Sequence, residues 1–230
     1  MKHIKTFESF IAEAGGRDAG KYEVAKIDIK TAVKLMEEKG YFEWIDQKEF
    51  ERNFLTLQKW VVTGKTKRKD MPVLSGGDVS LFADKLTDGL IDVHKPYFDF
   101  TTKGLIINTT NAEVFMTAGK LDGVEDDDKV SAKFEPIPAN KLKPIQEQIY
   151  FDECIGFLEH GLNKAIAIVE SKNSVVSSDN FIIDGHHRWG FAMLFAPTMK
   201  FRCLSIDLEI KKLVKVALDF GDALGNARNK

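Results

Sequence analysis

Apolar residues recur at helical spacing in the first third of the chain. The clearest series has members at i, i+4, i+7 and i+11, namely Phe50, Phe54, Leu57 and Val61. This spacing predicts a helix with one buried face. A second helix is predicted around the apolar group at 33–36, and Gly40 suits its end. Residues 21–63 are therefore expected to be mostly helical.

Between residues 71 and 138 the pattern changes to turns and short apolar runs. Pro72 and the pair Gly76-Gly77 lie at its start, where they are expected to interrupt regular secondary structure. Strands are predicted at 98–100, 105–107, 113–117 and 130–134. The acidic run at 125–128 lacks the alternating ligand spacing of a calcium loop, so it is expected to be a solvated loop.

Pro136 and Pro138 predict a boundary, after which helical spacing returns. The elements predicted there are a helix through 150–158, strands at 165–169 and 181–184 joined by a polar connection at 171–180, a helix over 189–196, a strand over 199–208 and a helix over 209–220. The fold class expected is α+β, with a helical N-terminal part, a β-rich centre and a mixed C-terminal domain. The units expected are 1–14, 21–138, 139–209 and 210–230.

Composition narrows the class of protein only a little. The chain has 230 residues, of which 43% are hydrophobic and 30% charged, as in an ordinary globular protein. Its net charge of −2 gives no overall basic character that would favour nucleic acid. The two cysteines, Cys154 and Cys203, lie in apolar segments and are expected to be buried thiols. No apolar run approaches the roughly 20 residues that span a bilayer, so no membrane partner is expected.

The side chains best suited to bind a ligand or to take part in catalysis occur together in one short turn. The apolar residues 181–183 are followed by Asp184, Gly185, His186, His187 and Arg188. This pattern predicts a buried strand, a tight turn at the glycine, and the start of a helix. The free N–H groups at a helix start attract anions, and arginine adds a planar fork for phosphate or carboxylate. The turn is therefore predicted to bind negatively charged oxygens.

This turn resembles the signature of the ParB/sulfiredoxin superfamily, which includes CTPases, sulfiredoxins, nucleases and free serine kinases. Upstream, residues 142–146 (Leu-Lys-Pro-Ile-Gln) resemble the Pro-x-Gln entry of those domains. The resemblance covers residues 139–209. It implies a nucleotide-binding domain of mixed secondary structure, with phosphoryl transfer, nucleotide hydrolysis or nuclease activity among the expected chemistries.

The resemblance also implies individual roles. His187 and Arg188 match the pair that binds nucleotide phosphates, and Asp184 matches an aspartate that holds magnesium or handles a hydroxyl proton. Lys143 and Gln146 are expected to face the same pocket. The ligands implied are ATP, ADP or CTP, or a phosphorylated small molecule, together with Mg²⁺.

The chain departs from the family at His186, where sulfiredoxins have a nucleophilic cysteine. Sulfinic acid reduction is therefore disfavoured, and the Gly-His-His-Arg sequence also differs from the Gly-Glu-Arg-Arg of the partitioning CTPases. Two alternatives remain open. One is a nuclease, in which His186 or His187 activates water beside a metal held by Asp184. The other is a binding domain without catalysis.

Residues 1–14 form an amphipathic pattern that ends at Gly15-Gly16. This leader resembles the capsid-targeting peptides of internal head proteins in large tailed phages. The resemblance implies cleavage by a prohead protease between Glu13 and Ala14, a prohead core as partner, and a location in the infected bacterial cytoplasm or the phage head. An ordinary N-terminal helix is the alternative. The leader also leaves open a third hypothesis for function, a non-catalytic internal protein of the virion or prohead core.

A basic run occupies residues 65–69 (Lys-Thr-Lys-Arg-Lys). Gly64-Lys65-Thr66 does not complete a P-loop, because that loop needs a glycine at position 59, where this chain has Lys59. The run is expected to be a solvated loop, with contact to the phosphate backbone of DNA as the alternative.

Overall fold

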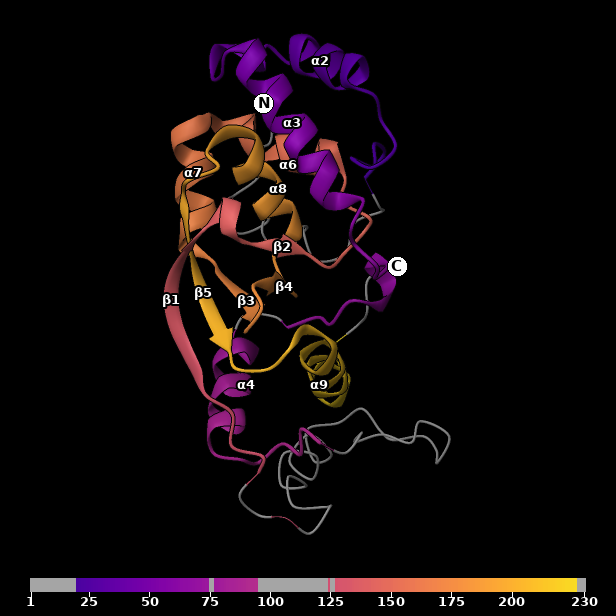
Figure 1. Ribbon diagram of the computed structural model, residues 1–230. Helices are drawn as coiled ribbons and strands as arrows, with labels where there is room; N and C mark the ends of the chain where they lie inside the picture. The colour runs from indigo at the N-terminus through magenta and orange to yellow at the C-terminus, as the bar shows by residue number, and fades with distance from the viewer. Residues whose placement is uncertain (1–19, 75–76, 95–123, 125–126, 227–230) are drawn as a thin grey trace, which may run out of the picture.

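The computed structural model describes residues 20–74, 77–94, 124 and 127–226. Within these residues a mixed five-stranded sheet has the order β1-β5-β3-β4-β2, and helices cover both of its faces (Figure 1). The α+β class predicted from the sequence is confirmed. The strands are β1 (Ala132–Pro138), β2 (Lys143–Pro144), β3 (Asn173–Ser177), β4 (Phe181–Ile182) and β5 (Lys200–Ile206).

The sheet mixes parallel and antiparallel pairs. Strand β5 is antiparallel to β1 and parallel to β3, where Ser174 stands opposite Cys203. Strand β4 is antiparallel to β3 through Val176 and Ile182, and parallel to β2. The short strand β4, which lies between β3 and the edge strand β2, therefore leads the chain into the Gly185 turn.

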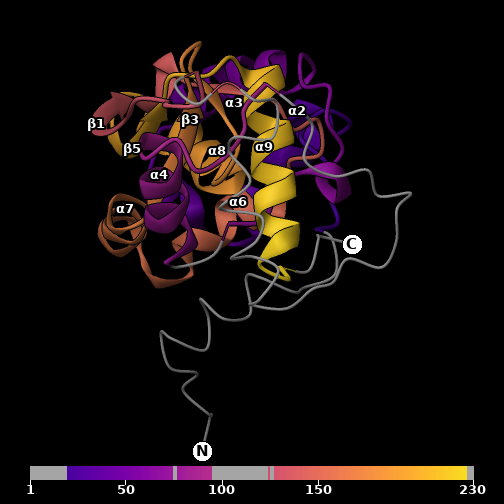
Figure 2. The ribbon, with the colours of Figure 1, turned by 90° about the horizontal axis from the view of Figure 1, so that it is seen from below.

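The alternation of side chains along the strands divides the core into two hydrophobic clusters. Val176 and Cys203 belong to one cluster, while Val175 and Leu204 belong to the other. The first cluster packs under α2 (Ile29–Glu38), α3 (Gln47–Val61), α6 (Phe151–Gly156), α7 (Leu162–Ser171) and α8 (His186–Phe195). The second packs under α4 (Asp78–Thr87) and α9 (Ile210–Ala223), which lie below the sheet in Figure 1 and stand in front in Figure 2. Short 3₁₀ helices are η1 (Tyr41–Glu43), η2 (Arg68–Asp70), η4 (Ala139–Lys141) and η5 (Phe157–His160).

The N-terminal helices form where the hydrophobic pattern predicts them. Asp28 and Asp46 cap α2 and α3, because their carboxylates accept the N–H groups of Thr31 and Glu49 at 2.8 and 3.1 Å. Gly40 follows α2 with a φ of 71°, which suits glycine. The predicted apolar face of α3 is fully buried at Phe50, Phe54, Leu57 and Val61.

Two predictions for residues 165–180 are wrong. Residues 165–169 lie in helix α7 and not in a strand, and the polar connection contains strand β3. A short apolar run does not by itself distinguish a strand from a buried helix. Ala165, Ile168 and Val169 are the buried residues of α7, and their spacing of three and four is helical. Strand β3 was missed because serines flank its two valines.

Three predictions for residues 71–138 also need correction. Residues 78–87 form helix α4, whose buried residues Val79, Phe82, Ala83 and Leu86 have helical spacing. Pro136 and Pro138 lie inside β1, so they do not mark a boundary. Strand β1 is an edge strand, where the missing proline N–H groups cost no ladder bond. In the acidic run, Asp128 is fully buried, and its carboxylate accepts the Val93 N–H at 2.8 Å.

Several predictions fall on residues outside the described part of the chain. They are the leader with its cleavage position at Glu13 and Ala14, and the strands predicted at 98–100, 105–107 and 113–117. The predicted strand at 130–134 corresponds to the first half of β1.

Candidate functional site

The predicted turn connects β4 to α8, as the sequence indicates. Gly185 precedes α8 with a φ of 94°, a conformation that favours glycine, and no side chain caps the helix. Among the described residues, we find no acceptor for the N–H groups of His186 and His187. The start of α8 is therefore an uncapped helix N-terminus with a partial positive charge.

Arg188 points into the body of the protein. Its Nη2 donates to the Asp184 carboxylate at 2.9 Å and to the Asn173 carbonyl at 3.0 Å. The side chain is 14% exposed, and the buried Nη1 has no acceptor among the described residues. A buried guanidinium nitrogen without a partner is costly, so this group favours an additional acceptor.

Asp184 lies at the opening of the turn, with 36% of its side chain exposed. Desolvation by the atoms packed around the carboxyl raises its pKa above the usual value. The positive charge of Arg188 and the hydrogen bond from the Gly185 N–H act in the opposite direction. The carboxylate accepts a hydrogen bond from Nη2 of the Arg188 guanidinium, and Nη1 has no acceptor among the described residues.

Ser174 is a site residue that sequence reasoning missed. It is fully buried in β3, and its Oγ has no partner among the described residues. A Cβ added at Gly185 would lie 2.7 Å from Arg188 Nη2 and 2.8 Å from Ser174 Oγ, so the hydroxyl and the guanidinium both pack against Gly185. The available signal was the Val175-Val176 pair between serines, which is compatible with a short buried strand.

His186 is buried and both of its ring nitrogens are engaged. Its Nε2 accepts the Gln146 N–H at 3.3 Å, and the ring bonds the Ile182 backbone. Burial, followed by the nearby His187 and Arg188, lowers its pKa to about 3. A neutral ring that accepts a backbone N–H is a structural connector and does not face a ligand.

His187 points towards α6 and away from Arg188. Its Nε2 accepts the Tyr150 N–H at 3.1 Å, and its Nδ1 lies 3.2 Å from Glu153 Oε2. Glu153 also pairs with Arg68 at 2.6 Å. Burial and the Arg68 charge lower the pKa of His187 to about 3, and Asp152 acts in the opposite direction. His187 is therefore not available to bind phosphate in this arrangement.

Lys143 and Gln146 do not join the turn either. Lys143 Nζ donates to the Asp179 carbonyl at 3.2 Å and lies over the Phe181 ring. Gln146 is buried, and its amide donates to the Gln148 carbonyl. The structure thus brings together Asp184, Gly185 and Arg188 with Ser174 and Asn173, and it separates them from the other predicted site residues.

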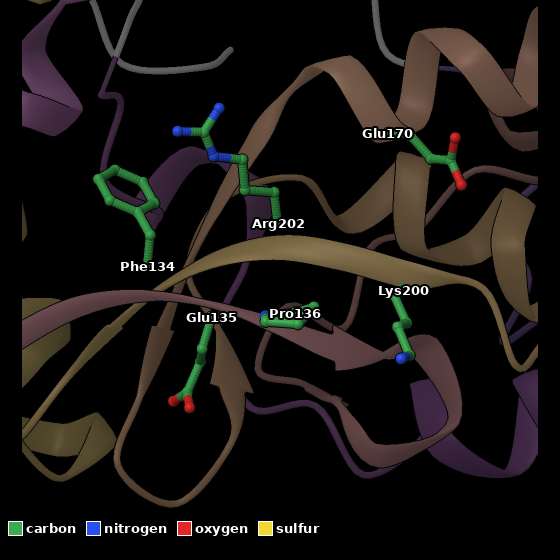
Figure 3. A pocket seen from close by; sticks show the side chains of 6 residues that line it. All are labelled: Phe134, Glu135, Pro136, Glu170, Lys200 and Arg202. Carbon is green, nitrogen blue, oxygen red and sulfur yellow. The ribbon is translucent and has the colours of Figure 1, made fainter.

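A surface hollow of about 310 Å³ lies elsewhere, on the β1–β5 pair, with Glu170 from α7 at its side. In Figure 3, Arg202 and Phe134 lie side by side, and the arginine is 5.1 Å from the ring centroid. The hollow is lined by positively and by negatively charged residues, and none of its lining residues belongs to the Asp184–Arg188 turn. Cys154 and Cys203 are buried free thiols, as predicted.

The described residues contain no group of three or more His, Cys, Asp or Glu side chains placed to hold a metal ion. None of their helices is both long and apolar enough to cross a membrane. Comparison with known proteins finds no family model, no curated protein and no solved structure that matches the chain.

Proposed function

We propose that this protein binds the phosphate group of a nucleotide or another phosphorylated small molecule at the Asp184–Arg188 turn. The observation that carries the proposal is the buried Arg188 Nη1, which has no acceptor among the described residues although Nη2 has two. The uncapped start of α8 supplies further donors beside it. Phosphate oxygens match this set of donors, and the resemblance of the turn to nucleotide-binding domains agrees with it.

Magnesium fits the proposal as a companion of the phosphate. Mg²⁺ is commonly held by one or two carboxylates together with substrate phosphates and water. Asp184 is a partly exposed carboxylate beside the guanidinium, so it is the residue that would hold the ion. Bound Mg²⁺ would supply positive charge for phosphoryl chemistry. Without it, the Asp184 carboxylate competes with phosphate for Arg188.

The nuclease alternative has less support. It requires His186 or His187 as a base, and a base must reach the proton that it removes. Both Nε2 atoms accept backbone N–H groups, at 3.3 and 3.1 Å. If the protein performs phosphoryl transfer or hydrolysis, Asp184 is the better candidate for handling the proton.

The test is titration calorimetry with ATP, ADP and CTP, each with and without Mg²⁺. Native protein is expected to bind at least one of them, and Arg188→Ala is expected to bind about tenfold or more weakly, since hydrogen bonds to charged groups are worth about 1.5–3 kcal/mol. Arg52→Ala removes an exposed arginine from α3 and serves as the matched control. Absence of binding by native protein, or equal binding by Arg188→Ala shown to be folded, contradicts the proposal.

We further propose that residues 1–13 are a removable targeting leader, on the sequence Ile11-Ala12-Glu13 followed by Ala14. The N–H groups of Gly20 and Lys21 donate to Glu153 and Asp152, and these contacts lie beyond the cleavage position. Mass spectrometry of purified virions tests this. A chain that begins at Ala14 supports the leader, whereas an intact Met1 or absence from virions refutes it.

A further inference from the structure

The basic run exposes its three lysines to solvent, as the sequence predicts for a solvated loop, but its backbone is hydrogen-bonded to the body of the protein. The N–H groups of Lys65 and Thr66 donate to the Ile145 carbonyl at 2.8 and 3.0 Å, and the Glu147 N–H donates to the Thr66 carbonyl at 3.0 Å. Gly64 packs so closely that an added Cβ would lie 2.7 Å from the Gln146 carbonyl oxygen.

Inward and outward side chains alternate along this segment. Thr66 and Arg68 are partly buried, whereas Lys65, Lys67 and Lys69 are exposed. The Arg68 side chain is only 11% exposed and pairs with Glu153, while its N–H donates to Gln148. The buried residues therefore hold the segment, and the three exposed lysines are left for solvent or a partner.

The two histidines of the α8 turn support this arrangement. His186 accepts the N–H of Gln146, the residue that forms a bridge with Thr66. His187 contacts Glu153, the partner of Arg68. Two hydrogen-bonded connections thus run from the first turn of α8 to the basic segment, and they reduce the conformational entropy that the segment would lose on binding.

We propose that Lys65, Lys67 and Lys69 form a docking surface for the sugar–phosphate backbone of a nucleic acid. Lys65 and Lys67 lie two residues apart on an extended segment, so their Cα atoms are separated by about 7 Å. Lys69 lies two residues further along, in the 3₁₀ helix η2. Three exposed positive charges so close together in the chain match the closely spaced negative charges of a phosphate backbone. Within residues 64–70 the only acid is Asp70, and Glu153 pairs with Arg68. The three exposed lysines therefore leave this segment with a positive charge, although the whole chain has a net charge of −2.

This surface is separate from the Arg188 site, and it does not depend on nucleotide binding there. None of the contacts that fix the basic segment involves Arg188, Asp184 or Ser174. Binding through lysines to phosphates is insensitive to base sequence and weakens with added salt, because bound counterions are released.

The experiment is fluorescence anisotropy with labelled single-stranded DNA, duplex DNA and RNA across a range of salt concentrations. The variant Lys65→Ala/Lys67→Ala/Lys69→Ala is compared with Lys30→Ala/Lys34→Ala/Lys48→Ala, which removes three exposed lysines from α2 and α3. The first variant is expected to bind about tenfold or more weakly, and to lower the slope of log affinity against log salt for duplex DNA by about 2.7. The second variant is expected to bind as the native protein does.

Three results would overturn the proposal. They are no binding of any of the nucleic acids by native protein at low salt, an equal loss in the control variant, and equal or tighter binding of polyglutamate or anionic lipid vesicles. Thermal unfolding of both triple variants verifies that they remain folded, which is expected because all six lysines are exposed.

Discussion

The two sides of the first turn of α8 differ in how their polar groups are partnered. On the histidine side, the Nε2 atoms of His186 and His187 both accept backbone N–H groups. On the arginine side, Arg188 Nη1 and Ser174 Oγ are buried and have no partner among the described residues. Within this turn, the two histidines thus hold the fold together, whereas the arginine keeps a hydrogen-bond donor that has no acceptor among the described residues.

This difference shows that residue type alone does not identify a catalytic group. Histidine is a common base because its usual pKa is near neutral. Here burial lowers the pKa of both histidines to about 3, and each ring serves as a hydrogen-bond acceptor for the main chain. The two histidines are structural, whereas an inconspicuous serine in β3 lies beside Gly185, next to the Arg188 guanidinium.

The largest expected effect is on the histidine side. His186→Ala would leave the Gln146 N–H without its acceptor and open a cavity, so it is expected to lower the free energy of unfolding by about 2–4 kcal/mol. Urea denaturation measures this. His94→Ala, at an exposed position, is the control and is expected to have little effect. Similar losses in the two variants would contradict a structural role for His186.

The pH dependence of stability gives the next largest effect. The pKa of each histidine is about 3 in the folded protein and near 6.5 in the unfolded chain. The unfolded state therefore binds more protons between these values, and stability falls as the pH is lowered from 6.5 towards 3. Each histidine contributes up to about 1.4 kcal/mol per pH unit.

Urea denaturation at pH 7, 6, 5 and 4 measures this slope. His187→Gln keeps an acceptor for the Tyr150 N–H but removes the titrating ring, so it is expected to have a shallower slope than the native protein. A slope that is the same in both proteins would show that His187 is not held neutral.

A smaller effect is expected from Asp184→Asn on the arginine side. This change removes the carboxylate charge that occupies Arg188 Nη2 and keeps the shape of the side chain. Without Mg²⁺, the affinity for a nucleotide is expected to rise by about fivefold, or about 1 kcal/mol. With Mg²⁺ the affinity is expected to fall. Calorimetry with ADP, first with EDTA and then with excess Mg²⁺, measures the affinity of native and variant protein under both conditions. Equal affinities of the two proteins in both conditions would show that Asp184 does not belong to the binding site.

The smallest effect is expected at Ser174. Ser177 lies in the same strand, so the two serines can be compared directly. Ser174→Ala removes a hydroxyl without a partner among the described residues, so stability is expected to change by less than about 0.5 kcal/mol. Ser177 Oγ bonds Asp179 at 2.6 Å and accepts the Phe181 N–H at 3.0 Å, so Ser177→Ala is expected to cost about 1–2 kcal/mol. Urea denaturation compares them, and an equal loss would mean that Ser174 is already satisfied.

The sequence by itself determined the features that depend on local pattern. The buried face of α3, the strand at 200–206 and the glycine turn before α8 all follow from spacing or from the conformational needs of single residues. These signals are complete within a few residues of the chain, and for this reason the α+β class could be predicted.

Only the tertiary structure decided which polar groups remain available. His187 is directed to Glu153 and Tyr150, and Arg188 to Asp184, by packing between segments that are distant in sequence. The same is true of Ser174, which lies beside Gly185 because β3 pairs with β5 and β4. Hydrogen-bond partners and burial depend on the complete fold, so a motif gives the residues of a turn but not the ones left free to bind.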